Sequence, residues 1–244
     1  MDDMRALREG ADKLGLRLTG KQLEQFQIYY EELIDWNRRM NLTAITDYRE
    51  VQIKHFLDAL TITLAWQPSQ DDPYVHILDV GTGAGIPGLP LKILFPDIKL
   101  VLLEATAKKV LFLRNLVRRL GLPDVEFVVM RAEDAAHLAQ YREMFNVVLC
   151  RALAPLAVMA ELTLPFCEVG GVLIAQEKGN TDQEIQQASR AVHLLGGNIK
   201  EVIRINLLDF SDDRGLIVVG KISPTIKRYP RRPGIPTKRP LVDP

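Results

Sequence analysis

The 244-residue chain is 47% hydrophobic and 25% charged, which is ordinary for a globular protein whose core needs no disulfide or metal support. Its 31 basic and 31 acidic residues cancel, so net charge alone gives no sign of a nucleic-acid partner. No apolar run approaches the roughly 20 residues that span a bilayer, and Cys150 and Cys167 lack metal-ligand spacing. We therefore expect a cytoplasmic protein without a metal or a membrane partner.

Residues 1–70 are predicted to form an N-terminal helical segment. One amphipathic helix is indicated by apolar side chains at helical spacing, which are Leu23, Phe26, Tyr30, Leu33 and Ile34. A second helix is predicted to begin after Thr46 or Asp47, either of which can cap it. His55 and Asp58 on this second helix either cover a cleft and touch substrate or stabilise the helix locally.

Residues 71–222 are predicted to form an α/β domain of the Rossmann-like kind. Five apolar runs separated by helical stretches are expected to be strands: 75–80, 98–104, 125–130, 145–150 and 171–176. Continuous apolar strands alternating with helices indicate a mostly parallel sheet that is covered on both faces. Two more runs, 199–208 and 216–222, are joined by a short polar turn. They predict a terminal antiparallel hairpin that completes a seven-stranded sheet.

Residues 223–244 form a basic, proline-rich C-terminal tail. The tail holds six basic residues and six prolines but a single acid, Asp243. Cations and an aromatic ring on a stiff backbone can contact phosphates and stack on a base. We therefore expect the tail to fold back toward the cleft and bind RNA, the alternative being a solubilising tail. The predicted RNA-binding residues are Arg228, Tyr229, Arg231, Arg232, Lys238 and Arg239.

The stretch "DVGTGAGIPG" follows the first predicted strand and contains two overlapping ligand-binding patterns. Gly83, Gly85 and Gly88 fit the dinucleotide pattern G-x-G-x-x-G, which predicts an NAD(P)-dependent oxidoreductase. Asp79 and Gly81, followed by two of the same glycines, fit D-x-G-x-G-x-G instead. A carboxylate at this place would repel a pyrophosphate, whereas S-adenosylmethionine offers an ammonium and a sulfonium group. The acid therefore favours the methyl donor, and the oxidoreductase stays as the alternative.

Further polar side chains are expected at the same edge of the sheet, where parallel strands end. Glu104 ends the second predicted strand about 20 residues after the glycines, where an acid can hold a ribose diol of either ligand. Ala132 and Glu133 follow the third strand, where an adenine ring would lie, and Arg151 follows the fourth. The alternative is that Glu133 and Arg151 are solvated loop charges.

Several motifs spread over most of the chain occur together. They are "NLTAI" (41–45), "KHFLDAL" (54–60), "DVGTGAGIPGLPL" (79–91), "LLEATAKKVLFL" (102–113), "RAE" (131–133), "CRALAPL" (150–156), "EKG" (177–179) and "YPRRPGIPTKRPL" (229–241). In this combination the chain resembles the ribosomal RNA small subunit methyltransferase G family, also called glucose-inhibited division protein B. One departure is Ala59, where the family pattern has Ser.

The resemblance implies a class I S-adenosylmethionine-dependent methyltransferase fold. It further implies methylation of guanine N7 in the decoding-region loop of 16S rRNA, with the RNA presented in a 30S subunit or an assembly intermediate. Carried over by position, the resemblance implies donor contacts from Gly81, Ile86, Glu104, Ala105, Thr106, Ala132, Glu133 and Arg151.

Guanine N7 carries an exposed lone pair and no proton, so its methylation needs no general base. We therefore expect no catalytic acid or base, and a mechanism that depends on positioning, which is worth about 7–11 kcal/mol of barrier. Arg151 either donates to guanine O6 or serves the carboxylate of the methyl donor. A non-catalytic RNA-binding regulator remains a further alternative.

Overall fold

The structure is a computed structural model, and it describes residues 4–69, 75–152, 154–179, 182–207, 210 and 213–242. Leu153 of the "CRALAPL" motif, Asp243, most of the linker expected between the helical segment and the sheet, and part of the turn between the last two strands lie outside these residues.

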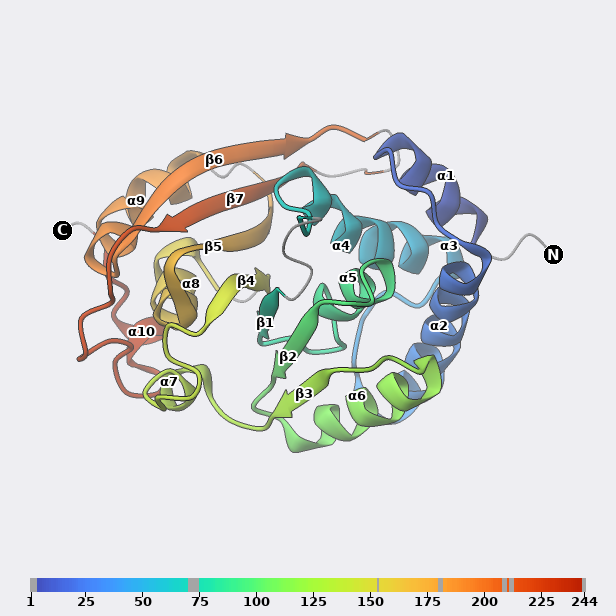
Figure 1. Ribbon diagram of the computed structural model, residues 1–244, viewed down its shortest axis with the longest axis horizontal. Helices are drawn as coiled ribbons and strands as arrows, with labels where there is room; N and C mark the ends of the chain where they lie inside the picture. The colour runs from blue at the N-terminus through green and yellow to red at the C-terminus, as the bar shows by residue number, and fades with distance from the viewer. Residues whose placement is uncertain are drawn as a thin grey trace.

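The strands of the described residues form one sheet in the order β3-β2-β1-β4-β5-β7-β6 (Figure 1). They are β1 (His76–Val80), β2 (Lys99–Leu103), β3 (Val125–Val128), β4 (Phe145–Arg151), β5 (Cys167–Lys178), β6 (Gly197–Ile205) and β7 (Arg214–Lys221). β7 runs antiparallel to both of its neighbours, and the pairs among β1 to β5 are parallel. The predicted α/β class, with its mostly parallel sheet and terminal antiparallel hairpin, is confirmed.

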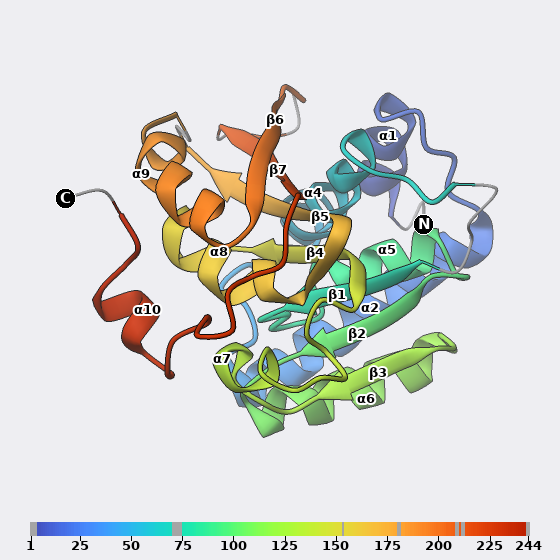
Figure 2. The same cartoon turned by 60° about the vertical axis from the view of Figure 1, so that its left-hand side comes forward.

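Helices cover both faces of this sheet (Figure 2). They are α1 (Arg5–Lys13), α2 (Gly20–Met40), α3 (Tyr48–Val51), α4 (Asp58–Leu60), α5 (Gly88–Leu94), α6 (Ala107–Leu120), α7 (Ala132–Ala135), α8 (Leu156–Thr163), α9 (Asp182–Leu194) and α10 (Ile235–Lys238). Successive residues of a strand point to opposite faces, so Ile77 joins a core under α1 to α6, and Leu78 joins a second core under α7 to α9. This double burial explains why the strands are continuously apolar.

The N-terminal helices share the first core of the sheet, and α2 packs on α5 and α6. Thr19 caps α2 in a capping box with Gln22. The buried face of α2 is centred on Tyr29, between Phe26 and Leu33, and not on the predicted Tyr30, which is partly exposed. Asp47 caps α3, as one of the two predicted alternatives has it. The predicted second helix is not uniform, because a π-helical turn (Gln52–Leu57) separates α3 from α4, and a 3-10 turn (Thr61–Leu64) follows.

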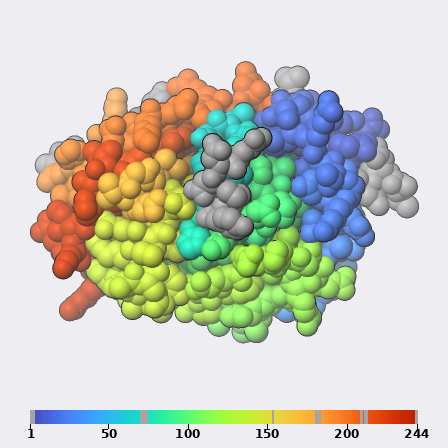
Figure 3. Space-filling model, in the orientation of Figure 1, coloured from blue at the N-terminus to red at the C-terminus, as the bar shows by residue number. Residues whose placement is uncertain are grey.

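The C-terminal tail lies against the α/β domain at the end opposite the N-terminal helices (Figure 3). The Arg142 guanidinium donates to the carbonyls of Ala136, Tyr229, Thr225 and Ile226. His137 Nε2 lies 2.8 Å from Pro230 O. These bonds turn the chain back along α7 and α8, so that the tail reaches the carboxyl edge of the sheet as expected.

Candidate functional site

The glycine loop after β1 is built around the side chain of Asp79. Thr82 Oγ1 and the Gly88 N–H both donate to Asp79 Oδ2, at 2.6 and 2.9 Å, and the residue is fully buried. Its other oxygen, Oδ1, is buried without a hydrogen-bond partner among the described residues. The side chain thus points into the protein and ties the two ends of the loop together.

The backbone of this loop adopts the left-handed conformation at Gly81, Gly83 and Gly85, with φ of 68°, 59° and 91°. Residues with a Cβ rarely adopt such angles, which explains the three glycines. The loop is also held from outside the α/β domain, because Tyr29 Oη on α2 donates to Ala84 O at 2.6 Å. Sequence reasoning missed Tyr29, whose one signal was its place beside the apolar stripe of α2.

Asp79 predicts a measurable pH dependence of stability. Burial raises the pKa of Asp79 to about 6, although the hydrogen bonds from Thr82 and Gly88 oppose the shift. The folded pKa lies above the unfolded value of about 3.9, so the contribution of Asp79 to stability is complete below about pH 4 and is lost as the pH rises through 6. Relative to Asp79→Asn, the free energy of unfolding of the wild type should fall by about 2 kcal/mol from about pH 4 to about pH 7 in urea titrations. A difference that stays constant over this range would contradict the prediction.

A pocket of about 500 Å³ lies at the carboxyl ends of β1, β2 and β3, next to this loop. Its lining includes five residues predicted to contact the donor: Gly81, Glu104, Ala105, Ala132 and Glu133. The other predicted contacts, Asp79, Gly83, Gly85, Ile86, Thr106 and Arg151, are not part of its lining. The structure therefore brings together the residues that follow three separate strands, as expected of a doubly wound sheet.

Glu104 joins the glycine loop to the start of α6. Its Oε2 accepts the Gly83 N–H at 3.1 Å, and its Oε1 accepts the Thr106 N–H at 2.8 Å. Lys109 Nζ lies 3.9 Å from Oε2. An ionised carboxylate has about four acceptor sites, so these bonds leave capacity for two hydroxyl groups of a ribose. The carboxylate is fixed before any ligand arrives.

Glu133 faces the tail as well as the pocket. Its Oε1 accepts the backbone N–H of Gly234 at 3.0 Å, and Pro233, Gly234 and Thr237 line the same pocket. The sequence predicts that the tail comes near the cleft. It does not predict that the tail forms part of the pocket wall, because no local pattern pairs residue 133 with residue 234.

The six tail residues predicted to bind RNA divide into two groups. Tyr229 is 5% exposed and Arg231 is bound to Glu161 through several hydrogen bonds. The Tyr229 ring is too buried to stack on a base as expected. The Arg231 guanidinium is engaged by Glu161 within the fold. The Arg228 guanidinium lies 5.0 Å from the centre of the Tyr229 ring. Arg228, Arg232, Lys238 and Arg239 are exposed.

Arg151 lies in a second cluster at the ends of β4 and β5, where it lines a separate, small hollow together with Asp58. Its Nη2 lies 3.1 Å from Asp58 Oδ2 and donates to Lys54 O at 2.7 Å. Arg214 Nη1 is 2.6 Å from the other oxygen of Asp58. Burial, together with the charge of Arg151, lowers the pKa of His55 to about 3, so its ring is neutral at physiological pH. The N-terminal segment therefore holds Arg151 through Asp58, so Asp58 makes contacts well beyond its own helix.

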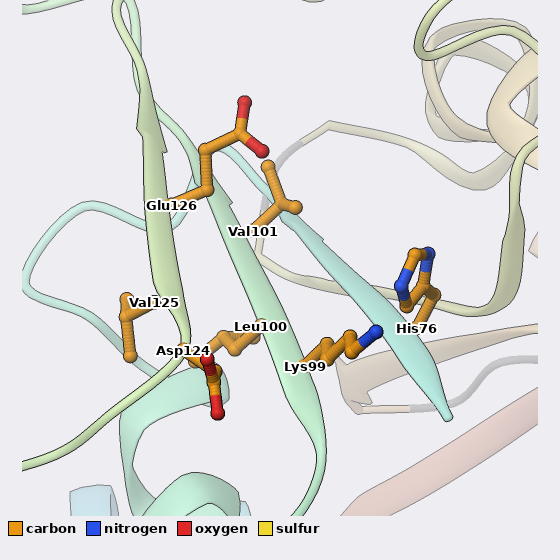
Figure 4. A pocket seen from close by; sticks show the side chains of 7 residues that line it. All are labelled: His76, Lys99, Leu100, Val101, Asp124, Val125 and Glu126. Carbon is orange, nitrogen blue, oxygen red and sulfur yellow. The ribbon is translucent and has the colours of Figure 1, made fainter. Parts of the chain in front are cut away.

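Another hollow lies near the amino ends of β1, β2 and β3. Its lining includes His76, Lys99, Asp124 and Glu126 (Figure 4). Ligands of doubly wound sheets bind at the carboxyl ends of the strands, so we do not assign the donor to this hollow. Within the described residues, no group of three His, Cys, Asp or Glu side chains is arranged to hold a metal ion. None of the helices described here is long and apolar enough to cross a bilayer.

The strand order, the reversed β7 and the pocket at the carboxyl edge define the class I methyltransferase fold. Precorrin-6y C5,15-methyltransferase from Geobacter metallireducens has a similar fold, with a TM-score of 0.50, 16% identity, and coverage of 68% of this chain and 88% of that one.

The sequence profile of rRNA small subunit methyltransferase G (GidB) matches residues 22–207. Ribosomal RNA small subunit methyltransferase G of Dehalococcoides mccartyi strain CBDB1 is 50% identical over 98% of this chain and 100% of its own length. The protein of the same name from Pelotomaculum thermopropionicum is 45% identical over 96% of this chain and 97% of its own. The chain belongs to the rRNA small subunit methyltransferase G family, and an NAD(P)-dependent oxidoreductase is not favoured.

Proposed function

We propose that the protein transfers a methyl group from S-adenosylmethionine to N7 of a guanine in the decoding-region loop of 16S rRNA. The RNA is presented in the cytoplasm, within a 30S subunit or an assembly intermediate. Family membership supports the rRNA substrate. The single observation that supports the donor site best is the pocket that joins Gly81, Glu104 and Glu133 from three strand ends.

The pocket fits S-adenosylmethionine in size and chemistry. Its volume of about 500 Å³ lies within the roughly 300–1,000 Å³ usual for small ligands. Glu104 would hold the ribose hydroxyls, and Ala132 and Glu133 would hold the adenine ring. The buried Asp79 Oδ1 has no partner in the described part of the chain, so an ionised Asp79 would attract a nearby cation across the low-dielectric loop. When bound, S-adenosylmethionine supplies the methyl group as a sulfonium substituent.

The remaining requirement for methyl transfer is that the protein hold the guanine base in place. N7 attacks with its own lone pair, so the protein needs to align the base and exclude water. Arg151 is suited to donate to guanine O6, because Asp58 and the Lys54 carbonyl hold its guanidinium. Arg228, Arg232, Lys238 and Arg239 would contact the phosphates, since they are exposed on the tail that borders the pocket.

The proposed function is tested by mapping alkali-labile N7-methylguanine in 16S rRNA from cells with and without this gene. We expect one modified guanine in the decoding-region loop to lose its methyl group when the gene is deleted. The wild-type chain should restore the methyl group and a Gly83→Asp chain should not. A non-catalytic regulator would predict restoration by both chains. An unchanged modification pattern in the deletion strain would refute the proposal.

A further inference from the structure

The C-terminal tail forms part of the wall of the donor pocket. Pro233, Gly234 and Thr237 line the pocket across from the strand ends, together with Leu162 of α8. α10 packs against α8, beside α7 (Figures 1 and 2). The shape of the pocket therefore depends on how firmly this short segment is attached to α8.

A buried ion pair attaches the tail to α8. Glu161 is fully buried, and its carboxylate accepts both the Nε and the Nη2 protons of Arg231, at 2.8 and 2.6 Å. The backbone N–H of Arg231 donates to Glu161 Oε1 as well, at 2.8 Å. This side-on fork satisfies both carboxylate oxygens and fixes the side chain and the backbone of Arg231 together.

The ion pair lies next to the pocket on both of its chains. Glu161 directly precedes Leu162, and Arg231 comes two residues before Pro233, and both of these neighbours line the pocket. The contacts from Arg142 and His137 hold the tail only as far as Pro230. Beyond Arg231, Gly234 is held by its bond to Glu133.

We propose that Glu161 and Arg231 are positioning residues for the methyl donor, because their ion pair holds residues 233–237 in place as a wall of the donor pocket. The inference rests on the proposed function and reassigns Arg231 from RNA contact to donor-site support. Removing Arg231 leaves a buried, unpaired carboxylate at Glu161, which is unfavourable enough to displace the segment that follows. Lysine cannot reproduce the fork, because its ammonium is a point charge on a flexible stem.

The test is the affinity of the full-length protein for S-adenosylmethionine, measured by calorimetry without RNA. Arg231→Gln and Glu161→Gln should each weaken binding about tenfold, within the range typical of coupled sites, and Arg231→Lys should weaken it less. The double variant should be no weaker than either single one, because the two residues act as one unit. In turnover assays the KM for the donor should rise with little change in kcat. Arg5→Gln, which breaks an exposed ion pair with Glu9 on α1, is the matched control and should bind the donor like the wild type.

Thermal unfolding of each variant identifies any that does not fold. If Arg231→Gln is unfolded, the partial loss of donor affinity in Arg231→Lys decides the question. Donor affinity equal to that of the wild type in both Arg231 variants would overturn the inference, and weaker RNA binding in those variants would then make Arg231 a phosphate contact. A wild-type protein that binds no S-adenosylmethionine would refute the proposed function itself, and this inference with it.

Discussion

Replacing Arg151 by Gln is expected to slow methyl transfer about a hundredfold, because a misplacement of about 1 Å can cost that much in rate. The Arg151 guanidinium is held by Asp58 and by the carbonyl of Lys54, so in the proposed role it would donate to the target base without rearrangement. It does not line the donor pocket, and the affinity for S-adenosylmethionine should therefore stay within about twofold of the wild type. Single-turnover methylation of 30S subunits gives the rate, and calorimetry gives the donor affinity.

Two companion variants test how Arg151 acts. Arg151→Lys keeps the charge but loses the planar fork, and we expect it to recover only part of the rate. Asp58→Asn weakens the ion pairs that hold Arg151 and Arg214, and should give an intermediate loss. If Arg151→Gln lowers the donor affinity by the same factor as the rate, Arg151 serves the carboxylate of the donor, and the assignment to guanine O6 is wrong.

The periodicity of the sequence predicted the sheet because each central strand is buried on both faces. Ile77 and Leu78 are neighbours in β1 and belong to different cores, which leaves a continuous apolar run in the sequence. The π-helical turn at Gln52–Leu57 had no such signal. His55 within this turn and Asp58 directly after it both contact Arg151, a partner more than 90 residues away that no local pattern indicates. Such turns often occur at functional sites.

Site residues could be predicted where a local sequence pattern fixes their place, and could not where a contact with a distant residue fixes it. Glu104 and Glu133 could be placed because parallel strands end at a common edge, so position along the chain implies position in space. Glu161 could not, because it lies inside a nearly uniformly apolar helix and its partner Arg231 is 70 residues away. The sequence pattern therefore does not distinguish Arg231 from the other basic residues of the tail, although its guanidinium neutralises a buried acid. A charge in an apolar helix is a signal of a specific partner, but not of which partner.

Replacing Gly85 by Ala is expected to cost more stability than the same change at Gly83, although both residues have positive φ. A Cβ at Gly85 would lie 2.5 Å from Leu89 Cδ1 and 2.8 Å from Tyr29 Oη. A Cβ at Gly83 would have Gly81 O as its nearest neighbour, at 3.8 Å. Gly83→Ala should therefore cost about 1 kcal/mol of backbone strain, and Gly85→Ala about 2 kcal/mol more from overpacking.

The overlap at Gly85 should also reach the function of the loop. Tyr29 holds the loop through its bond to Ala84 O, and a methyl group at Gly85 pushes the ring away from that carbonyl. Urea unfolding of the two variants measures the difference in stability, and calorimetry should show the larger loss of S-adenosylmethionine affinity in Gly85→Ala. Equal stability of the two variants would mean that α2 gives way without cost. In that case the N-terminal helices do not hold the donor loop, and the link between Tyr29 and Ala84 is incidental to the site.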